Sequence, residues 1–146
     1  MKKQITPCLW FNNQAKEAAA LYCSVFEKSK ITTQSPIVTE IDVSGQKFIL
    51  LDGGPMYHPT PSISFYYICE NVRELENIWD AFSKDGSVMM PLDKYPWAEK
   101  FGWVTDKFGI SWQFALGKPG DVGQKITPSL MFTGKQYGRV DEAIEH

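Results

Sequence analysis

The feature that most constrains the fold is a unit that occurs twice in the chain. It consists of an extended segment, a helix preceded by polar residues, and three further extended segments. The first unit spans about residues 5–52 and the second about residues 62–116. Neither unit can bury the helix-facing side of its strands alone, so we expect the two half-sheets to pair. The sequence therefore predicts a single α+β domain over residues 1–146, with tandem βαβββ modules that form a curved mixed sheet.

Hydrophobic periodicity places the individual elements. Apolar residues at helical spacing predict helices over residues 14–26 and 72–83. Asn12 or Asn13 can cap the first helix, and Glu70 or Asn71 stands where the second needs a cap. Runs of β-favouring residues, most of them alternating in polarity, predict the extended segments. These are residues 5–11, 31–33, 37–43, 47–51, 62–69, 87–92, 101–105 and 110–114.

The most informative stretch is a predicted hairpin near the end of the second unit. Residues 101–105 and 110–114 flank the sequence DKFG, whose Asp and Gly favour a tight turn. In the second strand the bulky residues Ile110, Trp112 and Phe114 share one face, which belongs in a core. The opposite face carries Ser111, Gln113 and Ala115, which are too small and polar to fill an interior. This second face is typical of a sheet that lines a small cavity.

The end of the chain begins the same pattern a third time. Residues 126–132 read ITPSLMF and echo ITPCLWF at residues 5–11. Residues 139–146 could begin a matching helix, but the chain stops within about two turns. Two interpretations remain open. The tail is either a partial third repeat or a strand that completes another sheet, which can include a sheet in a partner subunit.

Composition narrows the class of protein. The chain has 43% hydrophobic and 22% charged residues and a net charge of −2. These values suit a globular protein, and no basic tract offers a site for nucleic acid. No apolar run approaches the length of a membrane span. The chain contains Cys8, Cys23 and Cys69, whose spacing is not that of a metal site. Three free thiols suit a reducing compartment, so we expect a cytoplasmic protein.

Several motifs of the sequence, taken together, resemble those of one protein family. The βαβββ repeat, the ITPxLxF opening and a pattern of aromatic and glycine residues resemble the PhnB-like branch of the vicinal oxygen chelate superfamily. The superfamily includes glyoxalases, extradiol dioxygenases, fosfomycin-resistance enzymes and bleomycin-binding proteins. Members of the branch often carry the name 3-demethylubiquinone-9 3-methyltransferase, although the chain has no strand-linked glycine-rich loop for a nucleotide-like cofactor. The pattern comprises Trp97, Gly102, Trp103, Asp106, Phe108, Gly109 and Trp112.

The resemblance implies a divalent metal held by His, Glu or Gln side chains in the cup of the sheet. The matching positions in this chain are Thr6, Ser64 and Gln113. Hydroxyl groups are poor ligands beside imidazole or carboxylate, so the metal pattern is degenerate. Glu40 resembles a Glu that recurs in this branch, and Glu40 and Gln113 are the candidate metal ligands, with Asp52 as a third oxygen donor. The alternative is that no metal is bound.

The same cup gives the candidate substrate-binding residues. Gln113 has a competing interpretation, in which it only satisfies backbone groups. Trp103 and Trp97 can instead pack in the core or at a dimer interface. No catalytic residue is assigned. The substrate-binding candidates are Thr6, Trp10, Glu40, Asp52, Ser64, Tyr66, Trp103 and Gln113.

Three functions are compatible with these residues and with the resemblance. The first is a metal-assisted lyase, isomerase or dioxygenase acting on a small oxygenated substrate. The second is a binding protein that sequesters a small, partly aromatic molecule without chemistry, as resistance proteins of the superfamily do. The third, less favoured, is the methyltransferase of the branch's name. In each case the resemblance implies a homodimer, since its modules pair within a chain or across subunits.

Overall fold

The computed structural model describes residues 5–146, so the first four residues of the predicted domain lie outside it. The first module comprises β1 (Cys8–Phe11), α1 (Ala15–Val25), β2 (Ser29–Gln34), β3 (Val38–Val43) and β4 (Gln46–Asp52). Its four strands form a sheet, here called sheet A, in the order β1-β4-β3-β2. β1 is parallel to β4, and the other neighbours are antiparallel.

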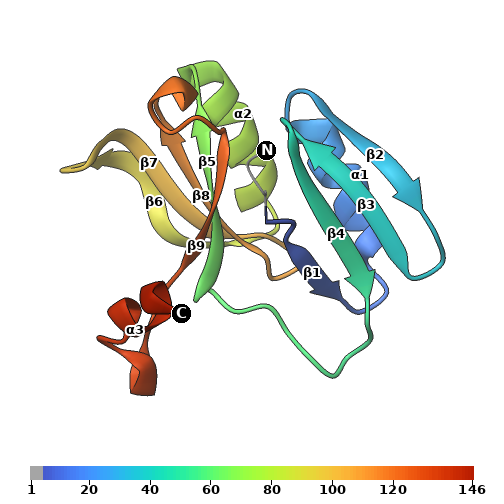
Figure 1. Cartoon of the computed structure of the whole chain (residues 1–146). Coiled ribbons are helices and arrows are strands. Elements are labelled where there is room, and N and C mark those ends of the chain that lie inside the picture. The colour runs from blue at the N-terminus through green and yellow to red at the C-terminus, as the bar shows by residue number, and fades with distance from the viewer. Residues whose placement is uncertain (1–4) are drawn as a thin grey trace.

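The second module repeats this plan. It comprises β5 (Ile63–Cys69), α2 (Val72–Ser83), β6 (Ser87–Tyr95), β7 (Ala98–Thr105) and β8 (Ser111–Leu116). Its strands form sheet B in the order β6-β7-β8-β5-β9, and β5 is parallel to β8 as β1 is to β4. The predicted tandem βαβββ modules and the hairpin over residues 101–114 are confirmed. The strands form two separate mixed sheets, which Figure 1 shows side by side.

The tail adds one strand to sheet B. After the short helix η1 (Pro119–Asp121), β9 (Ile126–Leu130) pairs antiparallel with the edge of β5 that β8 leaves free. The chain then continues through η2 (Gly134–Gln136) into α3 (Val140–Glu145), which Figure 1 shows below sheet B in red. The structure shows a strand that extends a sheet of its own chain, and the partial third repeat stays a prediction.

The start of α1 differs from the sequence prediction. Its N-cap is Gln14, whose side chain makes no capping bond. Instead, Asp52 at the end of β4 accepts hydrogen bonds from the backbone N–H groups of Gln14 at 2.9 Å and Ala15 at 3.0 Å. The prediction that Asn12 or Asn13 caps this helix is wrong, because a carboxylate distant in sequence occupies that position. At α2 the prediction is confirmed, since Asn71 accepts a bond from the backbone N–H of Glu74 at 2.9 Å.

One aromatic core joins the two modules. Tyr22 on α1 stacks on Phe82 of α2, with ring centroids 5.9 Å apart. Trp112 on β8 is fully buried and contacts both rings, at 5.3 and 5.5 Å. The predicted core face of β8 is therefore confirmed, and its small polar face points away from the helices. No helix among residues 5–146 combines the length and apolar character needed to cross a membrane.

Candidate functional site

The face of sheet B that points away from α2 gathers several of the predicted site residues. Trp103 on β7 is the register partner of Gln113 on β8, which in turn is the partner of Tyr66 on β5. Partners in neighbouring strands point to the same face and lie roughly 5 Å apart. Gln113 therefore stands in a row between two aromatic side chains. We call this side of the sheet the open face of sheet B.

Two pairs of polar side chains on the open face are joined by hydrogen bonds. The Nε2 of Gln113 donates a hydrogen bond to the Oγ of Ser64 at 2.8 Å. The indole N–H of Trp103 donates to the Oγ of Ser111 at 2.7 Å. Ser64 and Ser111 are buried, whereas Trp103 and Gln113 are half-buried. The bond to Trp103 uses the only polar atom of its side chain, so the rest of the ring is an apolar wall.

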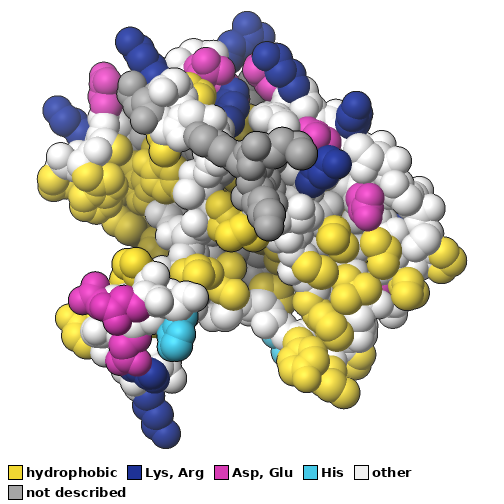
Figure 2. Space-filling model, in the orientation of Figure 1, with side chains coloured by type: hydrophobic (Ala, Val, Ile, Leu, Met, Phe, Trp, Pro, Cys, Tyr) yellow, Lys and Arg dark blue, Asp and Glu magenta, His cyan; other side chains and the backbone are white. Residues whose placement is uncertain are grey.

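Further aromatic side chains extend this wall towards β6. The ring of Tyr66 stacks on Phe101, with centroids 6.1 Å apart. Tyr95 and Trp97 stack at 5.1 Å, and each also contacts Phe101. Trp97 is 61% exposed, so it is not a core residue. Figure 2 shows hydrophobic side chains over the β6–β7 end of the molecule, on the left of the view.

Phe101 and Tyr95 belong to this wall but were not among the residues predicted from the sequence. The alternation along β7 carried the signal for Phe101, because residues 101 and 103 share a face. Tyr95 could not be found in this way, since β6 pairs with β7 through three register shifts. Burial raises the pKa of Tyr66 above its usual value, so its hydroxyl is a neutral donor at neutral pH.

Two other predicted residues meet on sheet A. Thr6 and Glu40 line a hollow of about 450 Å³, together with Lys47 and the hydroxyl-bearing Thr32 and Thr33. Glu40 lies on the face of β3 that points away from α1. This hollow and the open face of sheet B belong to different modules. Within one chain, Thr6 is therefore not grouped with Ser64 and Gln113, contrary to the expectation from the sequence.

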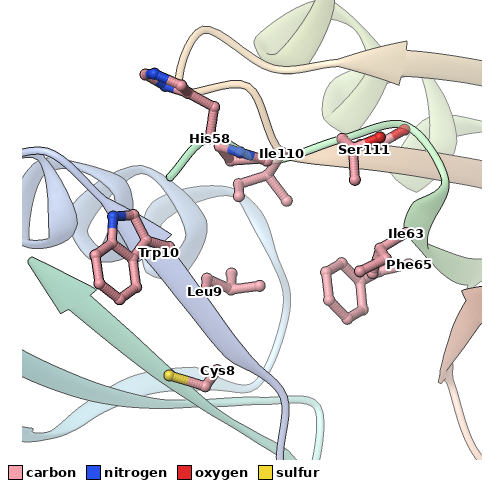
Figure 3. A pocket seen from close by; sticks show the side chains of 10 residues that line it. Cys8, Leu9, Trp10, His58, Ile63, Phe65, Ile110 and Ser111 are labelled. Atoms are coloured by element: carbon pink, nitrogen blue, oxygen red, sulfur yellow. The ribbon is translucent and has the colours of Figure 1, made fainter. Parts of the chain in front are cut away.

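Trp10 lines a third feature, a cavity of about 180 Å³ between β1, the loop over residues 53–62 and the start of β5. Its indole N–H donates to the carbonyl of Gly54 at 2.8 Å, and its ring meets Tyr57 edge-on. Figure 3 shows Leu9 and Phe65 facing each other across the cavity. At this volume the cavity is smaller than usual ligand pockets, so we regard it as a seam between the modules.

Among residues 5–146, the positions of the acidic and histidine side chains do not fit a metal centre. Asp52 uses one carboxylate oxygen at the start of α1, and Gln113 is bonded to Ser64. His58 lies at the top of the cavity in Figure 3 and Cys8 at the bottom, so they do not form a pair. Over residues 5–146, no three His, Cys, Asp or Glu side chains come close enough together to hold a cation.

Comparison with known proteins identifies the family. The profile of the 3-demethylubiquinone-9 3-methyltransferase family matches residues 3–115. The solved PhnB protein of Bacillus cereus is 32% identical and covers 79% of this chain and 100% of its own, with a TM-score of 0.73. The chain belongs to the 3-demethylubiquinone-9 3-methyltransferase family. No curated protein sequence matches it.

More distant structures share the fold of this 3-demethylubiquinone-9 3-methyltransferase family member. Lactoylglutathione lyase from Agrobacterium tumefaciens is 15% identical, with coverages of 80% and 96% and a TM-score of 0.56. The fosfomycin resistance protein FosX from Listeria monocytogenes, solved with Mn(II) and sulfate, is 10% identical, with coverages of 81% and 92% and a TM-score of 0.62. At these identities the likeness shows the fold, which is that of the glyoxalase, bleomycin resistance and dioxygenase proteins. The expected PhnB-like resemblance is confirmed.

Proposed function

We propose that this family member is a small-molecule-binding protein of the sequestering type, whose ligand lies on the open face of sheet B. The observation that carries the proposal is the row Trp103, Gln113 and Tyr66, in which one amide stands between two aromatic side chains. Gln113 donates to Ser64 and keeps its amide oxygen for a ligand. Such a row suits a planar, partly aromatic molecule that carries a hydroxyl group.

A suitable probe for this site is a small molecule with a planar ring and a hydroxyl group. A hydroxylated naphthoquinone, 2-hydroxy-1,4-naphthoquinone, presents a flat ring to the aromatic wall and a hydroxyl group to Gln113. The family's description names a quinone-related substrate, which makes this ring system a sensible choice. We expect it to raise the melting temperature of the protein, because a ligand that binds only the folded state stabilises that state.

Calorimetric titration with matched variants locates the binding. Gln113→Leu should weaken the affinity for the probe by about fivefold, since one hydrogen bond contributes about 1 kcal/mol. Gln34→Leu is the matched control, because Gln34 is an exposed strand residue on sheet A. Equal affinities for both variants would place the ligand elsewhere. No binding of this probe or of a panel of hydroxylated aromatics and antibiotics would refute the proposal.

The metal-assisted reaction is the second function implied by the resemblance, and FosX shows that this fold can hold a metal. In this chain, Glu40 and Gln113 lie in different modules, and the described donor residues do not fit a divalent cation. The binding proposal therefore includes no metal-dependent step. Stoichiometric binding of Mn²⁺ to the chelator-treated protein, measured by calorimetry, would favour the enzyme instead.

The methyltransferase activity named in the family's description can be tested directly. A methyl donor such as S-adenosylmethionine should bind at micromolar concentration if the protein transfers methyl groups, and we expect no heat of binding. Saturable binding of this donor would overturn the sequestering role. The predicted cytoplasmic location also remains part of the proposal, and the free thiols of Cys8, Cys23 and Cys69 fit a reducing compartment.

The predicted homodimer is a further part of the proposal. In one chain the hollow with Thr6 and Glu40 and the open face of sheet B belong to separate sheets. Two copies would complete one cup if the hollow of one copy faced the open face of the other. Sedimentation velocity with and without the probe would test whether ligand binding and pairing are linked.

A further inference from the structure

The last helix of the structure, α3, has apolar side chains that lie in solvent. Val140 and Ile144 are exposed, Ile144 by 76%, and Tyr137 just before the helix is exposed too. Residues four apart lie on the same side of a helix, so Val140 and Ile144 form one apolar stripe, here called the α3 stripe. Helices of folded proteins usually bury such a stripe. In the observed position, α3 therefore carries a packing surface that residues 5–146 leave exposed.

The tail that carries this helix starts from a firmly held strand. β9 pairs with β5 along its whole length, and Lys125 just before it lies 2.7 Å from the carboxylate of Glu74, which is buried. β9 also forms one border of the open face of sheet B, because Thr127 is the register partner of Tyr66. The tail is thus anchored at the edge of the proposed binding site.

One glycine separates the anchored strand from the helix. Gly134 has a φ of +57°, and a Cβ there would meet no atom within 4 Å among residues 5–146. A glycine is therefore needed at this position for the backbone turn and not for close packing. Beyond it, the guanidinium of Arg139 donates to Gln136 at 2.5 Å and to Glu142 at 2.7 Å, which joins η2 and α3 into one unit. Gly134 is placed as the hinge of that unit.

An apolar surface that could receive the α3 stripe lies within reach. Figure 2 shows the tail at the lower left, below the hydrophobic side chains of the β6–β7 end, with a hollow between them. β9 and β7 are three strand spacings apart in sheet B, or roughly 14 Å. The residues between Leu130 and Gly134 span roughly 10 Å when extended, and the unit beyond adds roughly 15 Å. The stripe can therefore reach Trp103 on β7.

From these observations we propose that η2 and α3 form a lid that turns about Gly134 and lays the α3 stripe on the aromatic wall of the open face. The inference rests on the proposed binding function, because the lid would cover the ligand between Trp103 and Tyr66. Closing removes apolar surface of both the stripe and the wall from water, which is favourable in proportion to the area buried. It also encloses a ligand that the open face alone leaves exposed on one side.

Nuclear magnetic resonance with one spin label tests this motion without any ligand. The nitroxide is attached to Ala143→Cys, which leaves the stripe intact, in a Cys8→Ser background that removes the exposed natural thiol. Closing should broaden the indole N–H signals of Trp97 and Trp103 on the open face, and the naphthoquinone probe should increase the effect. The signal of Trp112, buried on the helix side of sheet B, is the internal control and should stay sharper.

Two matched variants separate closing of the lid from mere proximity of the label. Val140→Ser removes one of the two side chains of the α3 stripe and should lower the closed population about tenfold, and the broadening of Trp103 with it. Asp141→Ser changes an exposed polar neighbour and should leave the broadening unchanged. Equal broadening in these two variants, or none in the starting protein with and without probe, would overturn the lid.

Dissociation kinetics of the probe separate this inference from the binding proposal. In stopped-flow measurements, Val140→Ser should raise the dissociation rate about tenfold and leave the association rate nearly unchanged, since the lid acts after the ligand is bound. Asp141→Ser should change neither rate. If the probe binds but leaves all three proteins at once, the lid is refuted and the binding proposal stands. If Val140→Ser reduces the broadening of Trp103 but no probe binds, the lid stands and the binding proposal is refuted.

Discussion

The hydroxyl of Tyr22 on α1 donates a 2.6 Å hydrogen bond to the carboxylate of Asp106, which follows β7 in the second module. The two residues are 84 positions apart in sequence and both are buried. Asp106 also accepts bonds from the indole of Trp112 at 3.0 Å and from the backbone N–H groups of Phe108 and Ile110. One carboxylate therefore fixes the β7–β8 turn and attaches it to the helix of the other module.

Removing the hydroxyl in Tyr22→Phe should lower the free energy of unfolding by about 1.5–3 kcal/mol, the usual contribution of a hydrogen bond to a charged group. The ring stays in place, so packing against Phe82 is kept. Urea denaturation followed by circular dichroism measures the change. Tyr137→Phe is the control, since Tyr137 is 84% exposed and should leave the stability unchanged. Equal stability of the two variants would show that the Tyr22 bond contributes nothing.

The buried carboxyl of Asp106 leads to a prediction about how stability depends on pH. Burial raises the pKa of its carboxyl above the unfolded value of 3.8, although its four hydrogen bonds oppose the shift. The folded state therefore binds the proton more tightly, and this contribution to stability is fully present below 3.8 and is lost as the pH rises through the folded pKa. Relative to Asp106→Asn, the free energy of unfolding of the natural protein should therefore fall as the pH rises from 3.8 through the folded pKa. A difference that grew with pH would contradict the raised pKa.

Asp52 should act on stability rather than on ligand binding. Its Oδ1 accepts two backbone bonds at the start of α1, where a negative charge is also favoured by the helix dipole. We expect Asp52→Ala to lower the free energy of unfolding by about 1 kcal/mol, as loss of a helix cap does. The affinity for the naphthoquinone probe should be unchanged in calorimetry. A loss of affinity with little loss of stability would instead show that Asp52 contributes to ligand binding.

Lys125 anchors the tail through a buried ion pair. Its Nζ lies 2.7 Å from the Oε1 of Glu74, whose side chain is only 4% exposed and also accepts a bond from Tyr67 at 3.0 Å. Lys125→Met leaves this carboxylate without its cation and should cost about 3 kcal/mol. The double variant Glu74→Gln/Lys125→Met should recover part of the loss, because the buried charge is then absent.

Lys100→Met provides the control for this experiment. The ion pair of Lys100 with Glu76 is half exposed, so its loss should cost about 0–1 kcal/mol. Thermal or urea denaturation of all three variants gives the comparison. If Lys125→Met and Lys100→Met were equally stable, Lys125 would not anchor the tail.

The modular plan of the fold could be predicted from local sequence. Residues that alternate or recur at helical spacing define which side of an element is apolar, and this information is contained in a short segment. For this reason α2 (Val72–Ser83) matched its predicted bounds, and the two faces of β8 were assigned correctly. The same alternation put Ser64 and Tyr66 on one face of their strand and Gln113 on the small polar face of its own, and the register of β5 and β8 brings these faces together.

Contacts between distant segments required the tertiary structure. Asp52 was expected in a ligand site, but the fold places it at the N-terminus of α1, 37 positions away in sequence from Ala15. Thr6 was expected beside Ser64, but the two sheets keep them apart. The sequence by itself determined the repeated units and the polarity of each strand, because these depend on neighbouring residues. Only the tertiary structure decided which faces meet and which motif fills the β5 edge, because those choices depend on packing between segments that no local pattern relates.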